Sequence, residues 1–476
     1  MWTQIKRWTG FAATLFVLSG AGRASAAPLR PSVLLISIDG LRPDYVLEAD
    51  KHGLKIPNLR RLQAEGAFST GVRGVLPTLT FPSHATLMTG ASPQKHGIYA
   101  NTPFDPLGKF GLRWNWYFEN FKVATLWQAA AKAGLTTANV RWPLSVGAPI
   151  TWNLPHIYFY GGAEDMKLYR LLSTPGLAAK LEQETRLPFP DTKDDMVGND
   201  ERFVDYAAQL LTTKRPGFMT VYLSGLDTVQ HETAPLSPEM RAVLERIDTS
   251  VGTLRAAAER TAGKRAVICV VSDHGFISAD KDFKLRFALR QAGLIDYDKD
   301  NNVTAWRAST SLTYGSGAVI LNDPKDDVSR VKVRETLAAL AADPQYGIDE
   351  VIEEAEIQKR GGNPNAAFLV TLKPGYRMLG GSTPPLLAPA KPGGAHGYAP
   401  TLSEMNAAFF IVGPGIMAGR SLGEIDLRDV APTLAGLMRA KLPDAEGKPL
   451  SLGAEPKKRQ SAAQKLLPAQ NPVAGK

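Results

Sequence analysis

Cysteine is nearly absent from this sequence: the 476-residue chain contains one, Cys269. A single cysteine excludes an intramolecular disulfide, and with it the small folds that depend on such bonds. Cys269 lies within the apolar run RAVICVVSD, where we expect it to be a small buried side chain. Because the chain is too long for one small core, we expect one large domain with insertions, or two domains.

Long hydrophobic runs are missing beyond residue 26, where no stretch is long and apolar enough to cross a membrane. The first 26 residues are typical of a signal peptide. Lys6 and Arg7 precede a short apolar segment, and Ala24, Ser25 and Ala26 form a small-residue cleavage pattern. Cleavage before Ala27 predicts a periplasmic or secreted protein without a membrane span, and a retained signal anchor is the alternative.

Negative charge is in deficit, since the formal net charge is +9 at pH 7. Most of the excess lies at the two ends: residues 1–26 carry +3 and residues 454–476 carry +4. Residues 27–453 therefore carry only +2. This distribution predicts a disordered basic tail over 454–476, and it does not indicate a surface for a nucleic-acid polymer.

The sequence does contain a repeated pattern of an apolar run followed by an amphipathic helix. SVLLISID (32–39), GFMTVYLSG (217–225) and RAVICVVSD (265–273) are apolar on both faces, as buried parallel strands are. Helical patterns separate them, so we expect an α/β fold with a mostly parallel central sheet. Residues 143–200 and 285–395 break this pattern, and we predict that they are insertions, within a domain over 27–453, that cover a site.

Histidine is scarce, with seven residues, yet acidic and imidazole groups follow the predicted strands. The carboxyl ends of parallel strands meet at one edge of a sheet, so side chains placed there should lie close together. Carboxylate oxygens and neutral imidazoles suit a divalent metal such as zinc, and six groups suffice for two ions. Five of these groups, Asp39, Asp227, His231, Asp273 and His274, follow predicted strands, and the sixth, His396, lies in the glycine-rich segment GGAHGYAP.

A hydroxyl-rich stretch, LTFPSHATLMTG (79–90), provides a possible nucleophile. Thr80 precedes Phe81 and Pro82, and SHATLMTG is the predicted helix. An isolated threonine there would be a helix cap, but coordination by a metal makes a hydroxyl an alkoxide able to attack phosphorus. His84, four residues on, is either a supporting hydrogen-bond partner or a packing residue.

The order of these motifs carries a family resemblance. SIDGLRPDY, TLTFPSHATLMTG, SPQKHGIYAN, LDTVQH, SDHG and AHGY follow one another between residues 37 and 398. The chain resembles the alkaline phosphatase superfamily and, within it, secreted bacterial members of the nucleotide pyrophosphatase/phosphodiesterase family, over roughly residues 32–450. The resemblance implies a three-layer alkaline-phosphatase-like fold with a mostly parallel central sheet and inserted cap segments.

The resemblance also implies roles for individual residues. One zinc ion would be held by Asp227, His231 and His396, and the other by Asp39, Asp273, His274 and the nucleophile Thr80. Asn101, in HGIYAN, would bind a phosphoryl oxygen, and Phe81 would hold the nucleoside. Further candidates for substrate stacking are Tyr158, Tyr160 and Tyr222. This chain has LSGLD where the family often has EEPD, and residues 143–200 match the vertebrate nucleotide enzymes poorly.

We therefore expect a secreted, zinc-dependent phosphodiesterase or nucleotide pyrophosphatase that acts on small phosphate esters or nucleotides. A phosphomonoesterase of the same superfamily is one alternative, with Arg141 as a possible extra cationic contact. A phosphonate hydrolase, a metal-dependent mutase and a non-catalytic metal-binding protein remain further alternatives. A sulfatase is disfavoured, because Thr80–His84 lacks the arginine of the sulfatase C/S-x-P-x-R motif.

Overall fold

The computed structural model describes residues 30–453, apart from 111–112, 158–162 and 191–195. The predicted signal peptide, the predicted tail, Tyr158 and Tyr160 lie outside the described residues. In the part of the chain that is described, no helix has both the length and the apolar character needed to cross a bilayer.

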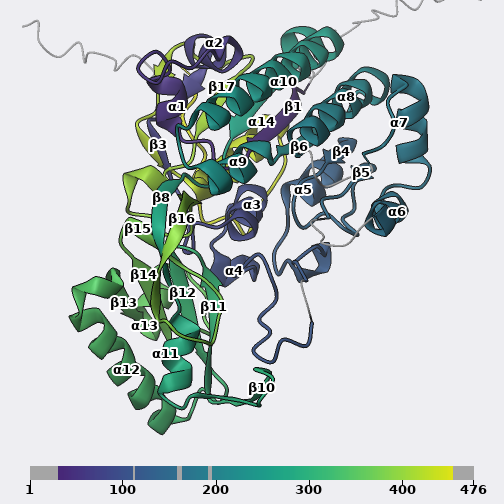
Figure 1. Cartoon of the computed structure of the whole chain (residues 1–476). Helices are drawn as coiled ribbons and strands as arrows, with labels where there is room; N and C mark the ends of the chain where they lie inside the picture. The colour runs from purple at the N-terminus through teal and green to yellow at the C-terminus, as the bar shows by residue number, and fades with distance from the viewer. Residues whose placement is uncertain (1–29, 111–112, 158–162, 191–195, 454–476) are drawn as a thin grey trace, which may run out of the picture.

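An eight-stranded central sheet organises the fold (Figure 1). β1 pairs in parallel with β6 and β7, and β4 pairs in parallel with β5 and β6, so the predicted mostly parallel sheet is confirmed. β17 runs antiparallel to β7. In spatial order the strands are β18 (Arg420–Ser421), β2 (Ala67–Phe68), β17 (Phe409–Val412), β7 (Ala266–Val271), β1 (Ser32–Ile38), β6 (Phe218–Leu223), β4 (Thr137–Val140) and β5 (Trp152–Leu154).

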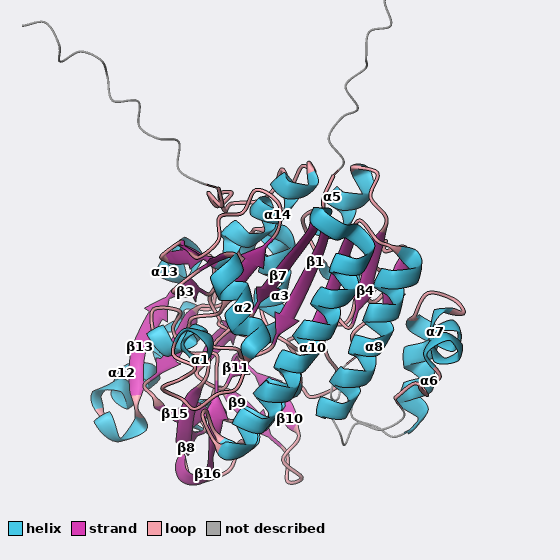
Figure 2. Cartoon of the chain, turned by 90° about the horizontal axis from the view of Figure 1, so that it is seen from above, coloured by secondary structure: helices cyan, strands magenta, loops and turns pink. Residues whose placement is uncertain are grey.

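Both faces of the sheet are covered, because alternate residues of its strands point in opposite directions. From β1, Leu34 and Ile36 join one apolar cluster, while Val33 and Leu35 join the other. Figure 2 shows α8 and α10 side by side across one face. The helices of that face are α1 (Pro43–Leu47), α2 (Pro57–Glu65), α7 (Leu177–Thr185), α8 (Met196–Lys214) and α10 (Pro238–Ala262). Those of the other face are α3 (Thr80–Thr89), α5 (Leu126–Lys132) and α14 (Val430–Met438).

A second group of strands and helices lies beside the edge of the sheet (Figure 1), and we call residues 277–395 the second module. Its four-stranded antiparallel sheet runs β11 (Ala308–Thr313), β12 (Ser316–Leu321), β14 (Phe368–Leu372) and β13 (Ile348–Glu353). A three-stranded sheet contains β15 (Gly375–Met378), β8 (Ile277–Phe283) and β16 (Leu387–Ala395). The module also contains α11 (Leu285–Gln291), α12 (Asp327–Ala342), α13 (Glu354–Lys359), β9 (Ile295–Tyr297) and β10 (Val303–Trp306).

The predicted insertion over 285–395 thus falls within the second module, and that over 143–200 contains β5, α6 (Ala163–Leu172), α7 and the start of α8. That both are insertions covering a site stays a prediction. The remaining elements are α4 (Pro93–His96), α9 (Gly225–Thr233), β3 (Gly71–Arg73) and β19 (Glu424–Asp426).

Candidate active site

The six predicted ligand groups meet at the carboxyl edge of the central sheet. Asp39 directly follows β1, Asp273 and His274 come just after β7, and α9, which follows β6, carries Asp227 and His231 one turn apart. The chain returns from the second module with His396, whose ring stacks on that of His274 at 3.7 Å between centroids. Three neighbouring parallel strands therefore position five of the six groups.

The glycines around His396 explain how this segment comes so close to α9 and β11. A Cβ atom on Gly394 would lie 2.6 Å from the carbonyl oxygen of Gln230 on α9. A Cβ on Gly397 would lie 1.9 Å from the carbonyl oxygen of Thr313, and Gly397 also has a positive φ of +83°. Only glycine fits these two positions without moving the backbone.

The three carboxylates each present a buried oxygen that has no hydrogen-bond partner: Asp39 Oδ1, Asp227 Oδ1 and Asp273 Oδ2. The opposite oxygens of two of them are engaged. Tyr222 donates its hydroxyl to Asp39 Oδ2, and the Gly40 amide donates to Asp273 Oδ1 at 3.1 Å. Buried anionic oxygens are costly unless they are paired or coordinate a cation.

The three imidazoles present their Nε2 atoms to the same region. Nδ1 of each ring bonds a backbone carbonyl: His231 that of Gly394 at 3.0 Å, His274 that of Gly275 at 3.2 Å and His396 that of Thr78 at 3.3 Å. A carbonyl only accepts, so Nδ1 carries the proton and Nε2 keeps its lone pair in the neutral ring. Burial is the main cause that lowers the pKa of His231 to about 4, and it lowers the pKa values of His274 and His396 well below the usual range.

These donor atoms form two overlapping groups. The ligand atoms of Asp227, His274 and His396 lie within 4.8 Å of one another, and so do those of Asp39, Asp273 and His274. His274 Nε2 is 3.1 Å from Asp273 Oδ2 and 3.4 Å from Asp39 Oδ1, so these contacts favour the second group for it. His231 Nε2 lies 3.4 Å from Asp227 Oδ1, beside the first group.

The chemistry of this donor set fits divalent cations. Burial raises the pKa values of Asp39, Asp227 and Asp273 well above the usual value, and repulsion between the three carboxylates adds to it. A cation reverses both effects, because it stabilises the ionised form of each carboxylate. Three unpartnered carboxylate oxygens and three imidazole Nε2 atoms are hard and borderline ligands of the kind zinc takes.

Thr80 is the first residue of α3, and its side-chain oxygen lies 3.3 Å from His274 Nε2. His84 fixes the backbone beneath it: Nδ1 bonds the Thr80 carbonyl at 2.7 Å, and Nε2 bonds the Ser37 hydroxyl at 2.9 Å. The His84 ring is fully buried. It is therefore both a hydrogen-bond partner and a packing residue, joining α3 to β1.

Asn101 lies next to the start of α3. Its Oδ1 accepts a hydrogen bond from the Phe81 amide at 2.9 Å, which leaves the side-chain NH2 as a donor. The Phe81 ring is 1 % exposed and packs at 5.3 Å from Trp114 and 6.2 Å from His156, measured between ring centroids. In this structure Phe81 therefore lies in a closed apolar cluster, and its assignment to nucleoside binding stays a prediction.

Tyr222, a predicted candidate for substrate stacking, does not present an open ring face. It is 3 % exposed, the rings of His84 and His156 meet it edge-on, and its hydroxyl bonds Asp39. This geometry gives Tyr222 a role in orienting a carboxylate. The hydrogen bond runs between β6 and the end of β1, and no local motif signals it.

The network that supports the start of α9 is the first feature not predicted from the sequence. Asp200 on α8 accepts from the Gly225 amide at 2.7 Å, at the start of α9, and forms a buried ion pair with Arg141. Arg141 also donates to the Ser224 hydroxyl at 2.9 Å. Arg141 thus anchors the helix that carries Asp227 and His231. A lone Asp in the sequence segment MVGNDERF gives no signal of this contact.

Tyr314 is the second unpredicted feature, on the turn between β11 and β12. Its ring lies 5.0 Å from His231 and 5.7 Å from His396, and 36 % of the residue is exposed. Its backbone has φ of +50°, which is uncommon for a bulky residue. A strained, exposed aromatic residue beside two site histidines is a candidate for substrate contact.

Comparisons with known proteins point to one family. Residues 33–399 match the family described as type I phosphodiesterase/nucleotide pyrophosphatase. The chain is 30 % identical to human ectonucleotide pyrophosphatase/phosphodiesterase family member 1 over 253 residues, which cover 52 % of this chain and 23 % of that protein. It is 24 % identical to the venom phosphodiesterase of Naja atra over 421 residues, covering 86 % and 44 % of the two chains.

The chain thus spans less than half the length of these curated relatives. Its fold is similar to that of murine ectonucleotide pyrophosphatase/phosphodiesterase 5, with a TM-score of 0.62 and 21 % identity, covering 88 % of this chain and 97 % of that one. This likeness confirms the predicted alkaline-phosphatase-like fold class. On the match over residues 33–399, the chain belongs to the type I phosphodiesterase/nucleotide pyrophosphatase family.

Proposed function

We propose that this protein is a secreted, zinc-dependent phosphodiesterase or nucleotide pyrophosphatase in which Thr80 is the nucleophile. The observation that carries the proposal is the convergence around the Thr80 hydroxyl. The unpartnered oxygens of Asp39 and Asp273 and the Nε2 atom of His274 gather there, at the edge of a parallel sheet. Such an arrangement suits in-line displacement at phosphorus.

Two zinc ions would be held as the resemblance implies. Asp227, His231 and His396 would hold one, and Asp39, Asp273, His274 and Thr80 the other. When bound, the ions would lower the pKa of the Thr80 hydroxyl and neutralise charge on the phosphoryl and leaving oxygens. The Nδ1 contacts to backbone carbonyls keep the imidazoles oriented and leave Nε2 available.

The chain's own residues would then position the substrate. Thr80 would attack phosphorus in line with the leaving oxygen, so that a bond to Thr80 forms while the bond to the leaving group breaks. The resulting phosphothreonine-type ester keeps the second substituent of the diester, and water hydrolyses it in a second step. The bond from the Phe81 amide fixes Asn101 Oδ1, so its NH2 group is free to donate to a non-bridging oxygen. Tyr314 offers an exposed aromatic surface beside the site for the second substituent of a diester.

The same geometry favours diesters over monoesters. A monoester dianion gains from additional cations, whereas a diester carries one charge and a second group to be bound. Arg141, which the sequence offers as an extra cationic contact for a monoester, forms an ion pair with Asp200 and a hydrogen bond with Ser224. Arg377, whose positive charge helps to lower the pKa of His231, forms an ion pair with Asp282 at 2.7 Å. Both arginines are engaged by carboxylates.

The relatives support a nucleotide or other small phosphate ester as the substrate. Murine ectonucleotide pyrophosphatase/phosphodiesterase 5 was solved as an inactive threonine-to-alanine variant in complex with AMP. That protein thus pairs a functionally required threonine with a nucleotide ligand. The predicted signal peptide supports a periplasmic or secreted location for this chain.

Removal of metal should abolish turnover of bis-p-nitrophenyl phosphate, and zinc should restore it. His231→Ala should lower the bound zinc from two ions toward one, measured by elemental analysis after gel filtration. His52→Ala is the matched control, because this imidazole contacts Asp44 and Glu48 outside the site. Full turnover in a sample shown to be metal-free would contradict the two-metal proposal.

Tyr222→Phe should weaken zinc binding by about 10- to 100-fold, because it removes the hydrogen bond that orients Asp39. Activity should recover at high zinc concentration, since the ligand itself remains. Tyr206→Phe provides the control, as its hydroxyl bonds the Leu187 carbonyl at 2.9 Å, away from the site. Equal zinc affinity in Tyr222→Phe and wild type, from competition with a chromophoric chelator, would rule out this positioning role.

Thr80→Ala should lower kcat by roughly three orders of magnitude or more while zinc content stays at wild-type level. Thr80→Ser should retain measurable turnover, because its hydroxyl remains. Thr249→Ala, on the exposed face of α10, serves as the control. A wild-type kcat in Thr80→Ala would instead favour direct attack by water. If Thr80→Ala loses zinc as well as kcat, the main role of Thr80 would be to bind the metal.

The diester preference should appear as about a tenfold higher kcat/KM for bis-p-nitrophenyl phosphate than for p-nitrophenyl phosphate. The thymidine 5′-phosphate p-nitrophenyl ester, on the same zinc-loaded sample, tests the nucleotide preference. Tyr314→Asn removes the ring but tolerates the positive φ, and it should reduce the diester advantage more than Phe81→Ala does. A ratio well below one in wild type would support the phosphomonoesterase alternative.

A further inference from the structure

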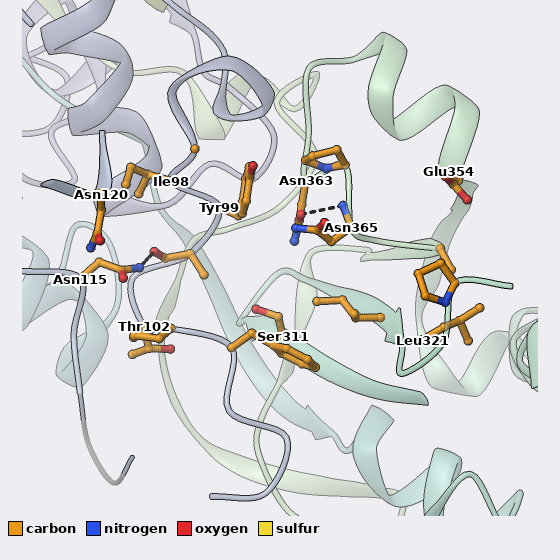
Figure 3. A pocket seen from close by; sticks show the side chains of 18 of the residues that line it. Ile98, Tyr99, Thr102, Asn115, Asn120, Ser311, Leu321, Glu354, Asn363 and Asn365 are labelled. Atoms are coloured by element: carbon orange, nitrogen blue, oxygen red, sulfur yellow. Dashed lines mark hydrogen bonds between the residues drawn. The ribbon is translucent and has the colours of Figure 1, made fainter. Parts of the chain in front are cut away.

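A cleft of about 600 Å³ opens between residues 97–104 and 115–122 on one side and the four-stranded sheet of the second module on the other. Its volume is within the range of about 300–1,000 Å³ that small-molecule sites occupy. Figure 3 shows Asn115 and Asn120 on one wall and Asn363 and Asn365 on the other. None of the six candidate metal-ligand groups lines this cleft.

Neutral amide side chains give the cleft its character. Asn115, Asn120, Asn363 and Asn365 bring amides from segments about 250 residues apart in the sequence, and Ser311 adds a hydroxyl from β11. Each amide both donates and accepts hydrogen bonds. Two of these groups bond within the protein: the Asn115 NH2 donates to the Ala100 carbonyl at 2.8 Å, and Asn363 Oδ1 accepts from the Asn365 backbone amide at 3.0 Å. The Asn115 side-chain carbonyl, the Asn363 NH2 and the side-chain amides of Asn120 and Asn365 still offer donors and acceptors on two opposite walls, which match a ligand with adjacent hydroxyl groups.

The charged and aromatic side chains of the cleft are already engaged. Arg330 pairs with Glu354 at 3.0 Å, and Lys122 donates to the Tyr99 hydroxyl at 3.2 Å. The Lys122 ammonium also lies 5.6 Å from the centre of the Tyr99 ring, while Trp306 packs edge-on against Phe104. Glu354 neutralises Arg330, whereas Lys122 contacts only the neutral Tyr99 and keeps its charge. One such lysine is fewer than the several cations that a phosphate group takes, and the contacts of Tyr99 with Lys122 and of Phe104 with Trp306 occupy part of each aromatic surface.

The cleft shares a wall with the phosphoryl-binding segment. Ala100 and Thr102 line it, and Asn101 lies between them. Asn115, in the same wall, donates its side-chain NH2 to the Ala100 carbonyl and its backbone amide to the Asn101 carbonyl, both at 2.8 Å. A ligand that contacts Asn115 therefore acts on the backbone that presents Asn101.

We propose that this cleft is a distal subsite for a neutral, hydroxyl-rich group, a sugar or polyol that forms the remote ester substituent of the substrate. The ligand class rests on the cleft alone. Its place in a phosphodiester substrate rests on the proposed function. The two parts need separate measurements.

Binding is measured first, on Thr80→Ala, so that turnover does not interfere. Saturation-transfer NMR with methyl α-glucopyranoside, myo-inositol and glycerol should show contact with at least one of them. Combining Asn120→Ala with Asn365→Ala should weaken that binding about tenfold, the effect of losing two modest hydrogen bonds. Gln94→Ala, an exposed amide on α4 outside the cleft, should leave it unchanged.

Unaltered binding in the Asn120/Asn365 variant with a wild-type melting temperature would overturn the assignment. So would the absence of binding by all three polyols, or their displacement by adenosine or inorganic phosphate at equal concentration. If the alanine variant has a lower melting temperature than wild type, it is replaced by Asn120→Ser with Asn365→Ser. These changes substitute a shorter side chain that still carries a polar group.

The substrate arm compares the methyl and glucosyl esters of p-nitrophenyl phosphate with otherwise wild-type Thr80. The glucosyl ester should have the lower KM, and the Asn120/Asn365 variant should remove that advantage while leaving the methyl ester unaffected. Equal KM values with intact polyol binding would overturn the subsite's place in the substrate. If the protein with wild-type Thr80 hydrolyses neither ester but still binds the polyols, the proposed function is overturned and the ligand class of the cleft stands.

Discussion

The close approach of three carboxylates in a buried region is the constraint on which the rest of the site depends. Repulsion and desolvation oppose ionisation of Asp39, Asp227 and Asp273, so the arrangement is favourable only where positive charge compensates it. The protein supplies a hydroxyl to Asp39 and an amide to Asp273, and leaves one oxygen of each without a partner. Fixing those oxygens and the imidazole lone pairs in advance lowers the cost of organising the site around cations.

A parallel sheet makes such a site possible because its strands end at one edge. β1, β6 and β7 are neighbours, so the chain segments that leave them place groups from residues 39, 227 and 273 together. The supports come from farther away. The Arg141–Asp200 pair anchors the start of α9, and His84 joins α3 to β1 through Ser37. Loss of such a support would shift a ligand without removing it.

The sequence predicts the parts of the site that depend on local patterns, and it misses those that depend on contacts between distant segments. Apolar runs that end in Asp39 or Asp273 mark strand ends, because burial imposes a local pattern, and the order of the motifs indicates the family. Tyr222 illustrates what local patterns miss. Its place in an apolar strand looks the same whether the ring binds substrate or the hydroxyl orients a carboxylate. Tyr314 and the four cleft asparagines have no periodic pattern. Only the packing of the second module brings Tyr314 beside the site, and Asn363 and Asn365 opposite Asn115 and Asn120.

On the proposed function, chemistry and substrate selection would be divided between the two parts of the fold, but they would not be independent. The central sheet and the segments that follow its strands position five of the six ligand groups, and Thr80 begins α3 on one face of that sheet, whereas the second module carries Tyr314 and leads into His396. Because the module adjoins a candidate metal ligand, it cannot move away without disturbing that group. Any contact that the module makes with substrate would therefore be fixed relative to phosphorus, and binding energy gained there would contribute to positioning for attack as well as to affinity.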